Sequence, residues 1–310
     1  MKAFALRSFR HRPRYHRGRR PRPAEGEVLV KVHAASVNGF DLAVANGHLN
    51  GAMEHRFPVV LGKDFAGTID EVGFGVDGYA VGDRVFGVVS KSFLGDGSLA
   101  EYVTVPVAVG IAKLPDTIDF TQAAGLGLAG TAAVDAFDAA EIGGGAIVLI
   151  AGATGGVGNQ AVQLAARAGA VVIATAHSAE EIAQVTALGA TSTVDYTGDV
   201  AAQVLAAHPE GVDAVLHFAG DPAALLTAIK KDGGFVSTIA QSAEQIGADD
   251  IRFASVYANP SSATLERVAQ NQAEERTTVT VQRIYRLDDA ADAFSHFAGG
   301  TRGKLVVTIG

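Results

Sequence analysis

Three glycines spaced three residues apart, Gly152, Gly155 and Gly158, form the segment that most clearly predicts chemistry. They follow an apolar strand-like run over residues 146–151 and precede an alanine-rich helical pattern that begins near Asn159. Glycines allow a sharp turn and close backbone approach, and a helix N-terminus offers free N–H groups to an anion. The segment therefore predicts a pyrophosphate site in a Rossmann-type domain. The alternative is a turn that only permits close packing of strand on helix.

The end of the next strand indicates which dinucleotide binds, because a carboxylate there binds the ribose of NAD and repels a 2′-phosphate. This strand ends in IATAHS, with no carboxylate at its tip. Thr175, His177 and Ser178 could donate hydrogen bonds to a 2′-phosphate. Glu180 and Glu181 lie close by in the sequence and weigh against it. The pattern favours NADP(H).

The absence of cysteine limits the remaining chemistry, since it excludes disulfides, thiolate nucleophiles and every cysteine-containing zinc site. The nine histidines show no metal-binding spacing such as H-E-x-x-H. No tyrosine has a lysine four residues later, so the short-chain reductase pattern is absent. Without metal, flavin or thiol, the available reaction is hydride transfer from nicotinamide to an electrophilic carbon or quinone.

The elements that position these residues show two different hydrophobic patterns along the sequence. The first ~115 residues alternate apolar and polar positions between glycine turns, which predicts short antiparallel strands. From about Ile118, buried strands alternate with alanine-rich helices, which predicts a parallel sheet covered on both faces. Beyond Pro260, the strand-like alternation of the first segment returns. We expect an α/β protein with a mainly-β catalytic domain over 1–117 and 261–310, and a doubly wound Rossmann domain over 118–260.

Composition and charge limit the partners. Hydrophobic residues make up 48% of the 310 residues and charged residues 19%, as in globular enzymes. The formal charge of −8 argues against nucleic-acid binding by the whole chain. No apolar run approaches ~18 residues and the first residues lack a secretory signal, so we expect a cytoplasmic protein without a membrane partner. Residues 7–22 carry eight arginines and no acid. We expect a solvated loop between two strands, although contact with RNA or an anionic surface stays open.

Short motifs along almost the whole chain resemble a known family. The chain resembles the zinc-independent medium-chain dehydrogenase/reductases, specifically the quinone oxidoreductase (zeta-crystallin-like) branch. Each motif is weak alone, but their order and spacing are specific. Besides the glycine loop, they are Ser36–Asp41, Phe57–Gly67, Val81–Gly87, Gly97–Tyr102, Gly130–Ala132, Leu188–Ala190, Val194–Tyr196 and Gly303–Lys304.

The resemblance implies a GroES-like catalytic domain around the Rossmann domain, with NADP(H) in the cleft between them. Zinc-dependent cousins hold a metal with a cysteine at the position of Asn38 and a histidine at that of Lys63, so no catalytic zinc is expected here. Relatives pair the edges of their Rossmann sheets, which implies a homodimer through residues 235–239.

The resemblance also assigns roles to individual residues. The nicotinamide and its ribose would meet Asn38, Thr131, Phe218, Ala219 and Gly220. The pyrophosphate would lie on Gly152, Thr154, Gly155, Gly156 and Val157, and the 2′-phosphate on Ser178 and Tyr196. Arg302 or Lys304 would close on the cofactor. Some NADPH-using relatives have a lysine where this chain has Glu181, which is a departure.

The catalytic candidates are Asn38, which would polarise a carbonyl, and Lys63, which would supply the proton that follows the hydride; solvent is the alternative donor. Asp41 and Asp64 are expected to be structural, accepting backbone N–H bonds or pairing with an arginine such as Arg84.

The predicted function is zinc-independent, NADPH-dependent hydride transfer to a quinone or a similar activated carbonyl acceptor. Two alternatives remain open: reduction of the C=C bond of an enone or enoyl thioester, and a non-enzymatic NADPH-binding sensor or structural protein on the same fold.

Overall fold

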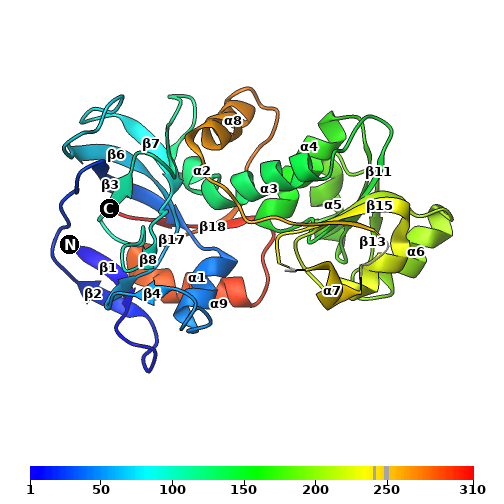
Figure 1. The fold of residues 1–310 in the computed structure, drawn as a ribbon, viewed down its shortest axis with the longest axis horizontal. Helices are drawn as coiled ribbons and strands as arrows, with labels where there is room; N and C mark the ends of the chain where they lie inside the picture. Colours follow the sequence, from blue (N-terminus) through cyan, green and yellow to red (C-terminus); the bar gives the residue numbers. More distant parts are fainter. Residues whose placement is uncertain (240–241, 248–250) are drawn as a thin grey trace. The chain divides into compact units, whose positions relative to one another are not determined.

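The computed structural model describes residues 1–239, 242–247 and 251–310. The chain divides into two compact units (Figure 1). Unit 1 comprises Met1–Ala129, Pro260–Glu274 and Val279–Gly310, and unit 2 comprises Gly130–Asn259 and Glu275–Thr278. The division falls inside helix α3 (Gly127–Ala139), whereas the sequence pattern suggested a division at 117/118. The difference arises because α2 (Phe120–Ala124) packs on the sheet of unit 1.

Unit 1 is built on a seven-stranded sheet with the order β10-β7-β6-β3-β18-β17, to which β9 adds by pairing with β3. The last strand, β18, lies antiparallel to β3, so the C-terminal segment completes the unit that the N-terminal segment begins. The strands are β3 (Glu27–Ser36), β6 (Asp64–Val72), β7 (Arg84–Val88), β9 (Tyr102–Pro106), β10 (Ile111–Lys113), β17 (Val281–Arg286) and β18 (Lys304–Thr308).

Smaller elements complete unit 1. A three-stranded sheet has the order β2-β1-β5, and β4 pairs with β8. These strands are β1 (Lys2–Leu6), β2 (Arg14–Arg17), β5 (Val59–Val60), β4 (Glu54–His55) and β8 (Phe93–Leu94). The remaining helices are α1 (Gly39–Ala45), α8 (Ser262–Ala273), the 3₁₀ turn η2 (Leu287–Asp289) and α9 (Ala290–Ala298).

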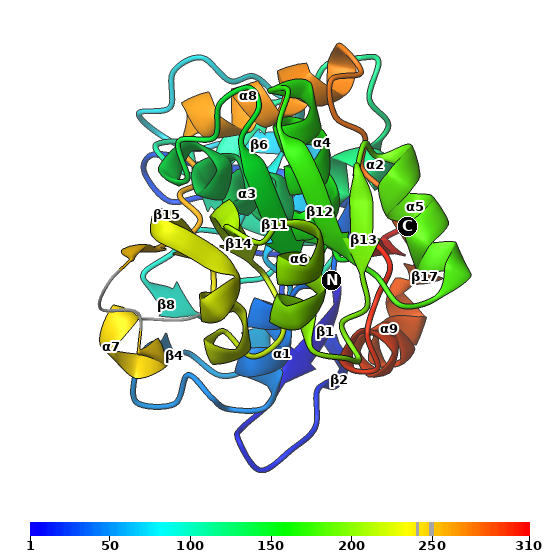
Figure 2. The ribbon, with the colours of Figure 1, turned by 90° about the vertical axis from the view of Figure 1, so that its right-hand side faces the viewer.

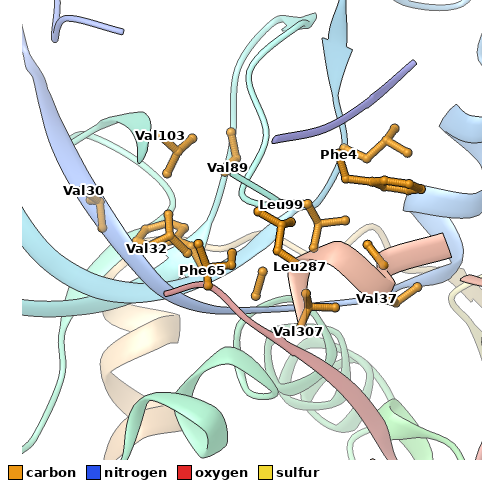
Figure 3. Packing of buried hydrophobic residues seen from close by; sticks show 14 of the residues in the cluster. Phe4, Val30, Val32, Val37, Phe65, Val89, Leu99, Val103, Leu287 and Val307 are labelled. Atoms are coloured by element: carbon orange, nitrogen blue, oxygen red, sulfur yellow. The ribbon is translucent and has the colours of Figure 1, made fainter. Parts of the chain in front are cut away.

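Side chains from these elements form one apolar core (Figure 3). Val30, Val32 and Phe65 from the central strands β3 and β6 lie in it with Val307 from β18. Each is at most 1% exposed, and burying a side chain of this size contributes about 1.5–3 kcal/mol. The core therefore holds the ends of β3, β6 and β18 in a defined register.

Unit 2 is a parallel six-stranded sheet with the order β13-β12-β11-β14-β15-β16, which is the doubly wound Rossmann order. Figure 2 shows β15, β14, β11, β12 and β13 in this sequence across the sheet. The predicted α/β fold class is confirmed. The elements are β11 (Ile147–Ala151), α4 (Gly156–Arg167), β12 (Val171–Thr175), α5 (Ala179–Ala187), β13 (Ser192–Val194), α6 (Val200–Ala207), β14 (Val212–His217), η1 (Ala223–Ala228), β15 (Ile229–Ser237), α7 (Ala243–Ile246) and β16 (Arg252–Ser255).

The central strand β11 shows why both faces of this sheet must be covered. Val148 and Ile150 pack in one apolar cluster with side chains of α4, whereas Leu149 and Ala151 pack in a second cluster with side chains of α6. Successive side chains of a strand point to opposite faces, so a continuous apolar run needs a helix on each side.

Two expectations about strands were wrong. Residues 235–239 were expected to form the sheet edge, but β15 lies between β14 and β16, so in the described part of the chain the edges are β13 and β16. Strand β16 has only four residues, too few for a periodic pattern to be recognised. The arginine-rich segment is not only a loop, because its residues 14–17 form β2 and pair antiparallel with β1.

Over the described ranges, no helix is both long and apolar enough to span a lipid bilayer.

Candidate functional site

The glycine loop of unit 2 has a shape that requires glycine at two of its three spaced positions, Gly152 and Gly158. Gly152 has a φ of +81°, and its N–H donates to the Thr175 hydroxyl at 2.9 Å. Gly155 is the N-cap of α4. A Cβ on Gly158 would lie only 2.1 Å from the Gly152 carbonyl oxygen. The loop is therefore closed by its own backbone, and no larger residue fits at its third glycine.

This closed loop presents the N-terminus of α4, a helix of twelve residues. The first N–H groups of a helix have no partner within it, and the aligned peptide dipoles give that end a partial positive charge. The Asn159 side-chain amide donates to the Ala153 carbonyl oxygen at 2.9 Å and so holds the loop against the helix. The N–H groups that follow Gly155 are thus free to bind the oxygens of a pyrophosphate.

Thr175 is at the end of β12, as predicted, but its hydroxyl is already used. It accepts the N–H of Gly152 and donates to the Ile150 carbonyl oxygen at 3.4 Å. A hydroxyl has only one proton to donate. Thr175 therefore positions the glycine loop in this structure.

His177, Ser178 and Tyr196, predicted for the 2′-phosphate, lie together around the carboxylate of Glu181. One oxygen of this carboxylate accepts the N–H of His177 at 2.7 Å and that of Ser178 at 3.2 Å, and the other accepts the Tyr196 hydroxyl at 3.2 Å. The Ser178 hydroxyl accepts the Glu181 N–H in return. This is a capping box, and the S-x-x-E spacing at the start of α5 is the signal that sequence reasoning overlooked.

Asp195 is a further charged group at this end of the sheet that sequence reasoning missed. Its carboxylate contacts the His177 ring at 3.0 Å. Hydrogen bonds from the backbone and side chain of Thr197, together with His177, lower the pKa of Asp195 to about 2. The neighbourhood of His177 therefore carries a permanent negative charge at neutral pH.

The segment Phe218–Gly220 lies beside the glycine loop at the carboxyl ends of β11 and β14, where ligands of such sheets bind. The Phe218 N–H donates to the Ala151 carbonyl oxygen at 3.0 Å, and a Cβ on Gly152 would lie 3.0 Å from the Ala219 nitrogen. His217, buried just before this segment, contacts the Gly220 carbonyl oxygen through Nε2 at 3.2 Å. Burial lowers the pKa of His217, so the ring is neutral.

Two other predicted cofactor residues are each described within their own unit. Thr131 is fully buried in α3 of unit 2. Arg302 precedes β18 in unit 1, where its N–H donates to the Gln282 side chain at 2.7 Å.

Unit 1 contains a buried polar cluster where the ends of three neighbouring strands meet. Its centre is Asp64, which is 0% exposed. Ser36 Oγ donates to this carboxylate at 2.6 Å, Asn38 Nδ2 at 3.0 Å and the Leu128 N–H at 2.7 Å. The Lys304 ammonium lies 3.2 Å from it. The strand register explains the cluster, because Ser36 of β3 is opposite Asp64 of β6, and β18 begins beside β3.

Asn38 joins this cluster to helix α1, which it precedes as the N-cap. Its N–H donates to Asp41 Oδ2 at 2.9 Å, and its side-chain oxygen accepts from the Lys304 ammonium at 2.6 Å. The prediction that Asp41 and Asp64 accept backbone N–H bonds is confirmed.

The suggestion that Arg84 pairs with Asp41 or Asp64 was wrong. Arg84 is opposite Thr68 in the β6–β7 register, whereas Val88 is opposite Asp64. The Arg84 guanidinium instead binds carbonyl oxygens and the carboxylate of the segment 115–118. The buried cation that pairs with Asp64 is Lys304, which was predicted only as a cofactor contact.

Asp41 and Lys63 are titratable groups whose pKa values are shifted by burial. Burial, reinforced by the charge of Asp64, raises the pKa of Asp41 to about 7. Burial lowers the pKa of Lys63, whose ammonium donates to the Val89 carbonyl oxygen and lies 4.8 Å from the Phe40 ring centre. Both line a cavity of about 20 Å³, which has room for one water molecule. Burial therefore acts on both groups in the direction that favours their neutral forms.

Two family descriptions match the chain: alcohol dehydrogenase GroES-like domain over residues 24–116, and zinc-binding dehydrogenase over residues 156–259. The residues present do not fit the zinc of the second name. The Asn38 side-chain oxygen is already in contact with the ammonium of Lys304, and the Lys63 ammonium has no lone pair to offer a metal. In the described ranges, no group of three or more His, Asp or Glu side chains is placed to hold a metal ion.

Relatives of known name align with most of the chain. The chloroplast envelope quinone oxidoreductase homolog of Arabidopsis thaliana is 30% identical over 303 residues, which cover 93% of this chain and 91% of the relative. The NADPH-dependent alkenal/one oxidoreductase of the same plant is 38% identical over 182 residues, or 57% of this chain and 47% of that protein. The quinone oxidoreductase structure from Coxiella burnetii superposes with a TM-score of 0.90 at 30% identity, covering 100% of this chain and 99% of that one. The chain is therefore an oxidoreductase that belongs to the medium-chain dehydrogenase/reductase superfamily, in its quinone oxidoreductase branch.

Proposed function

We propose that this protein is a zinc-independent reductase that uses NADPH to reduce a quinone. The observation that carries the proposal is the closed glycine loop, which joins β11 to α4 and leaves the helix N-terminus open to an anion. The names of the relatives from Arabidopsis thaliana and Coxiella burnetii support the quinone as acceptor.

The residues at the glycine loop fit the diphosphate of the cofactor. The backbone from Gly152 to Val157 would hold the pyrophosphate, with Thr154 at its edge. Phe218, Ala219 and Gly220 would line the nicotinamide ribose together with Asn38 and Thr131, and Arg302 would close on the cofactor.

The 2′-phosphate would bind at the donors that Glu181 now occupies. His177, Ser178 and Tyr196 each contribute one hydrogen bond to that carboxylate. A phosphate is an acceptor of the same kind, so it would replace Glu181 at these donors. NADPH binding therefore requires this carboxylate to turn away, which costs affinity that NADH does not lose.

Bound NADPH supplies the hydride, and the chain supplies orientation and a proton. Asn38 Nδ2 has one N–H on Asp64 and a second that is available to polarise an acceptor carbonyl. Lys63 donates one N–H to Val89 and retains two others. Because desolvation lowers its pKa, the Lys63 ammonium releases a proton more readily than an exposed lysine does.

The proposal is tested by following the oxidation of NADPH and NADH against quinones and α,β-unsaturated carbonyls, with each cofactor titrated in parallel. We expect turnover with quinones and NADPH. Lys63→Met should lower kcat with little change in NADPH affinity, and Lys63→Arg, which keeps the charge but holds its proton, should behave like Lys63→Met. Equal kcat in all three proteins would exclude Lys63 as the donor and leave solvent in that role.

A second candidate is reduction of the C=C bond of an enone, because the alkenal/one oxidoreductase of Arabidopsis thaliana aligns with 57% of the chain. The same panel separates the two, since the better acceptor is either the quinone or the enone. Tight NADPH binding without turnover on any acceptor would favour the non-enzymatic sensor instead.

We also propose that the chain forms a homodimer through β16, the edge strand that replaces the expected residues 235–239. An exposed strand edge presents unpaired N–H and C=O groups to a second copy. A monomeric mass by light scattering would contradict this assembly.

A further inference from the structure

The segment Arg7–Arg22, called here the basic hairpin, is unlike the rest of the chain in charge. It carries eight of the 25 lysines and arginines and no acid, in a protein of formal charge −8. All eight arginines are exposed. Within the part of the chain that the structure describes, Arg20 is the one among them with an ion-pair partner, Asp70. The other arginines are therefore free to bind an anionic partner.

The hairpin is an ordered element of unit 1. Residues 14–17 pair with β1 in antiparallel register, and the Gly18 N–H donates to the Met1 carbonyl oxygen at 3.0 Å. At its tip, the Ser8 carbonyl oxygen accepts the His11 N–H at 3.1 Å. Figures 1 and 2 both show this loop, in dark blue, extending beyond β1 and β2. Arg7, Arg10 and Arg12 therefore lie in a projecting loop, and Arg14 and Arg17 follow it in β2.

An aromatic cluster lies at the base of the tip. The Phe9 ring contacts the Phe57 ring edge to face, with centroids 5.0 Å apart, and the His55 ring at 4.7 Å. Phe9 is 42% exposed, Phe57 39% and Tyr15 38%. Exposed aromatic side chains beside arginines are the combination that settles at the boundary between lipid headgroups and acyl chains.

We propose that the basic hairpin docks this protein on an anionic lipid bilayer, with arginines on the headgroup phosphates and the Phe9–Phe57 pair at the acyl boundary. The inference does not depend on the proposed function. It replaces the expectation of a merely solvated loop, because the structure adds the ordered projection and the aromatic pair to the charge pattern.

A bilayer explains these features better than a nucleic acid does. The edge-to-face contact of Phe9 and Phe57 occupies ring surface on which a base would have to stack.

The test uses co-sedimentation of the full-length protein with vesicles of phosphatidylcholine alone and of phosphatidylcholine mixed with phosphatidylglycerol. Each arginine near such a surface contributes about 1 kcal/mol, which is roughly a fivefold change in affinity. Replacing four should therefore weaken binding by about two to three orders of magnitude. The four replacements are Arg10→Gln, Arg12→Gln, Arg14→Gln and Arg17→Gln.

A matched control removes the same charge elsewhere. It replaces four exposed cations outside the hairpin: Lys31→Gln, Lys231→Gln, Arg283→Gln and Arg286→Gln. We expect the control to bind mixed vesicles like the unchanged protein, and high salt to release both. Equal binding by the hairpin variant and the control, or no binding by the unchanged protein, would overturn the proposal.

Insertion of the aromatic pair has its own readout, because the chain contains no tryptophan. Phe57→Trp gives a single indole fluorophore in the aromatic cluster beside the hairpin, and we expect its emission to shift to the blue with mixed vesicles only. An unshifted emission in vesicle-bound protein would refute the insertion. Binding of a homopolymer RNA in the absence of vesicle binding would assign the hairpin to nucleic acid and overturn the membrane assignment.

Discussion

Replacing Asp41 by asparagine should stabilise this protein, and increasingly so as the pH rises. Asp41 is 2% exposed, and burial raises its pKa from 3.8 to about 7. Below the lower value, the carboxyl is protonated whether the chain is folded or unfolded. Between the two values, the unfolded chain ionises this group while the folded one does not, so folding stability falls as the pH rises. Above about 7 the loss is complete, at roughly 4 kcal/mol for about three pKa units.

Asp41→Asn removes this dependence and keeps an oxygen that can accept the Asn38 N–H. We expect its stability advantage over the unchanged protein to grow by about 3 kcal/mol between about pH 5 and about pH 8, as measured by urea unfolding. Asp119→Asn alters the same group at the exposed cap of α2 and is the matched control. An advantage that stays constant with pH, or that reverses at high pH, would refute the reasoning.

Three further predictions concern the buried ion pair and the cofactor loop. Lys304→Met leaves the Asp64 carboxylate without its cation and should lower the free energy of unfolding in urea by about 3–5 kcal/mol. The double variant with Asp64→Asn should recover part of this loss, and a loss below about 1 kcal/mol would show that the pair is not coupled. Gly158→Ala places a Cβ 2.1 Å from the Gly152 carbonyl oxygen and should weaken NADPH binding about tenfold or more. Gly143→Ala, which has open space around it, should leave NADPH binding unchanged, and equal NADPH titration curves for the two variants would contradict the loop argument. Glu181→Gln removes a negative charge from the donors proposed for the 2′-phosphate and should raise NADPH affinity roughly 5- to 10-fold, with NADH affinity unchanged. An equal change in affinity for both cofactors would show that the 2′-phosphate does not bind at these donors.

The division between local and long-range information explains which features were predictable. The glycine loop could be recognised from the chain alone because its chemistry is local: a strand, a turn that only glycine permits and a helix N-terminus follow one another within a few residues. The parallel sheet of unit 2 was predictable for a related reason, since buried strands alternate with helices along the sequence. The capping box of Ser178 and Glu181 is equally local and could have been found from its spacing.

The buried cluster of unit 1 could not be read in this way. Asn38, Asp64 and Lys304 lie far apart in the sequence, and nothing near Lys304 indicates a buried cation. They meet because β3 pairs with β6 on one side and with β18 on the other, which places their ends side by side.

The sequence by itself determined the α/β class, the position of the glycine loop and the absence of cysteine, because these depend on residue type and short spacing. Only the tertiary structure decided that Lys304 rather than Arg84 balances Asp64, that β16 rather than β15 is an edge, and that the arginine-bearing loop between β1 and β2 lies beside an aromatic pair. Strand register and burial set these outcomes, and both depend on pairing between segments that are distant along the chain.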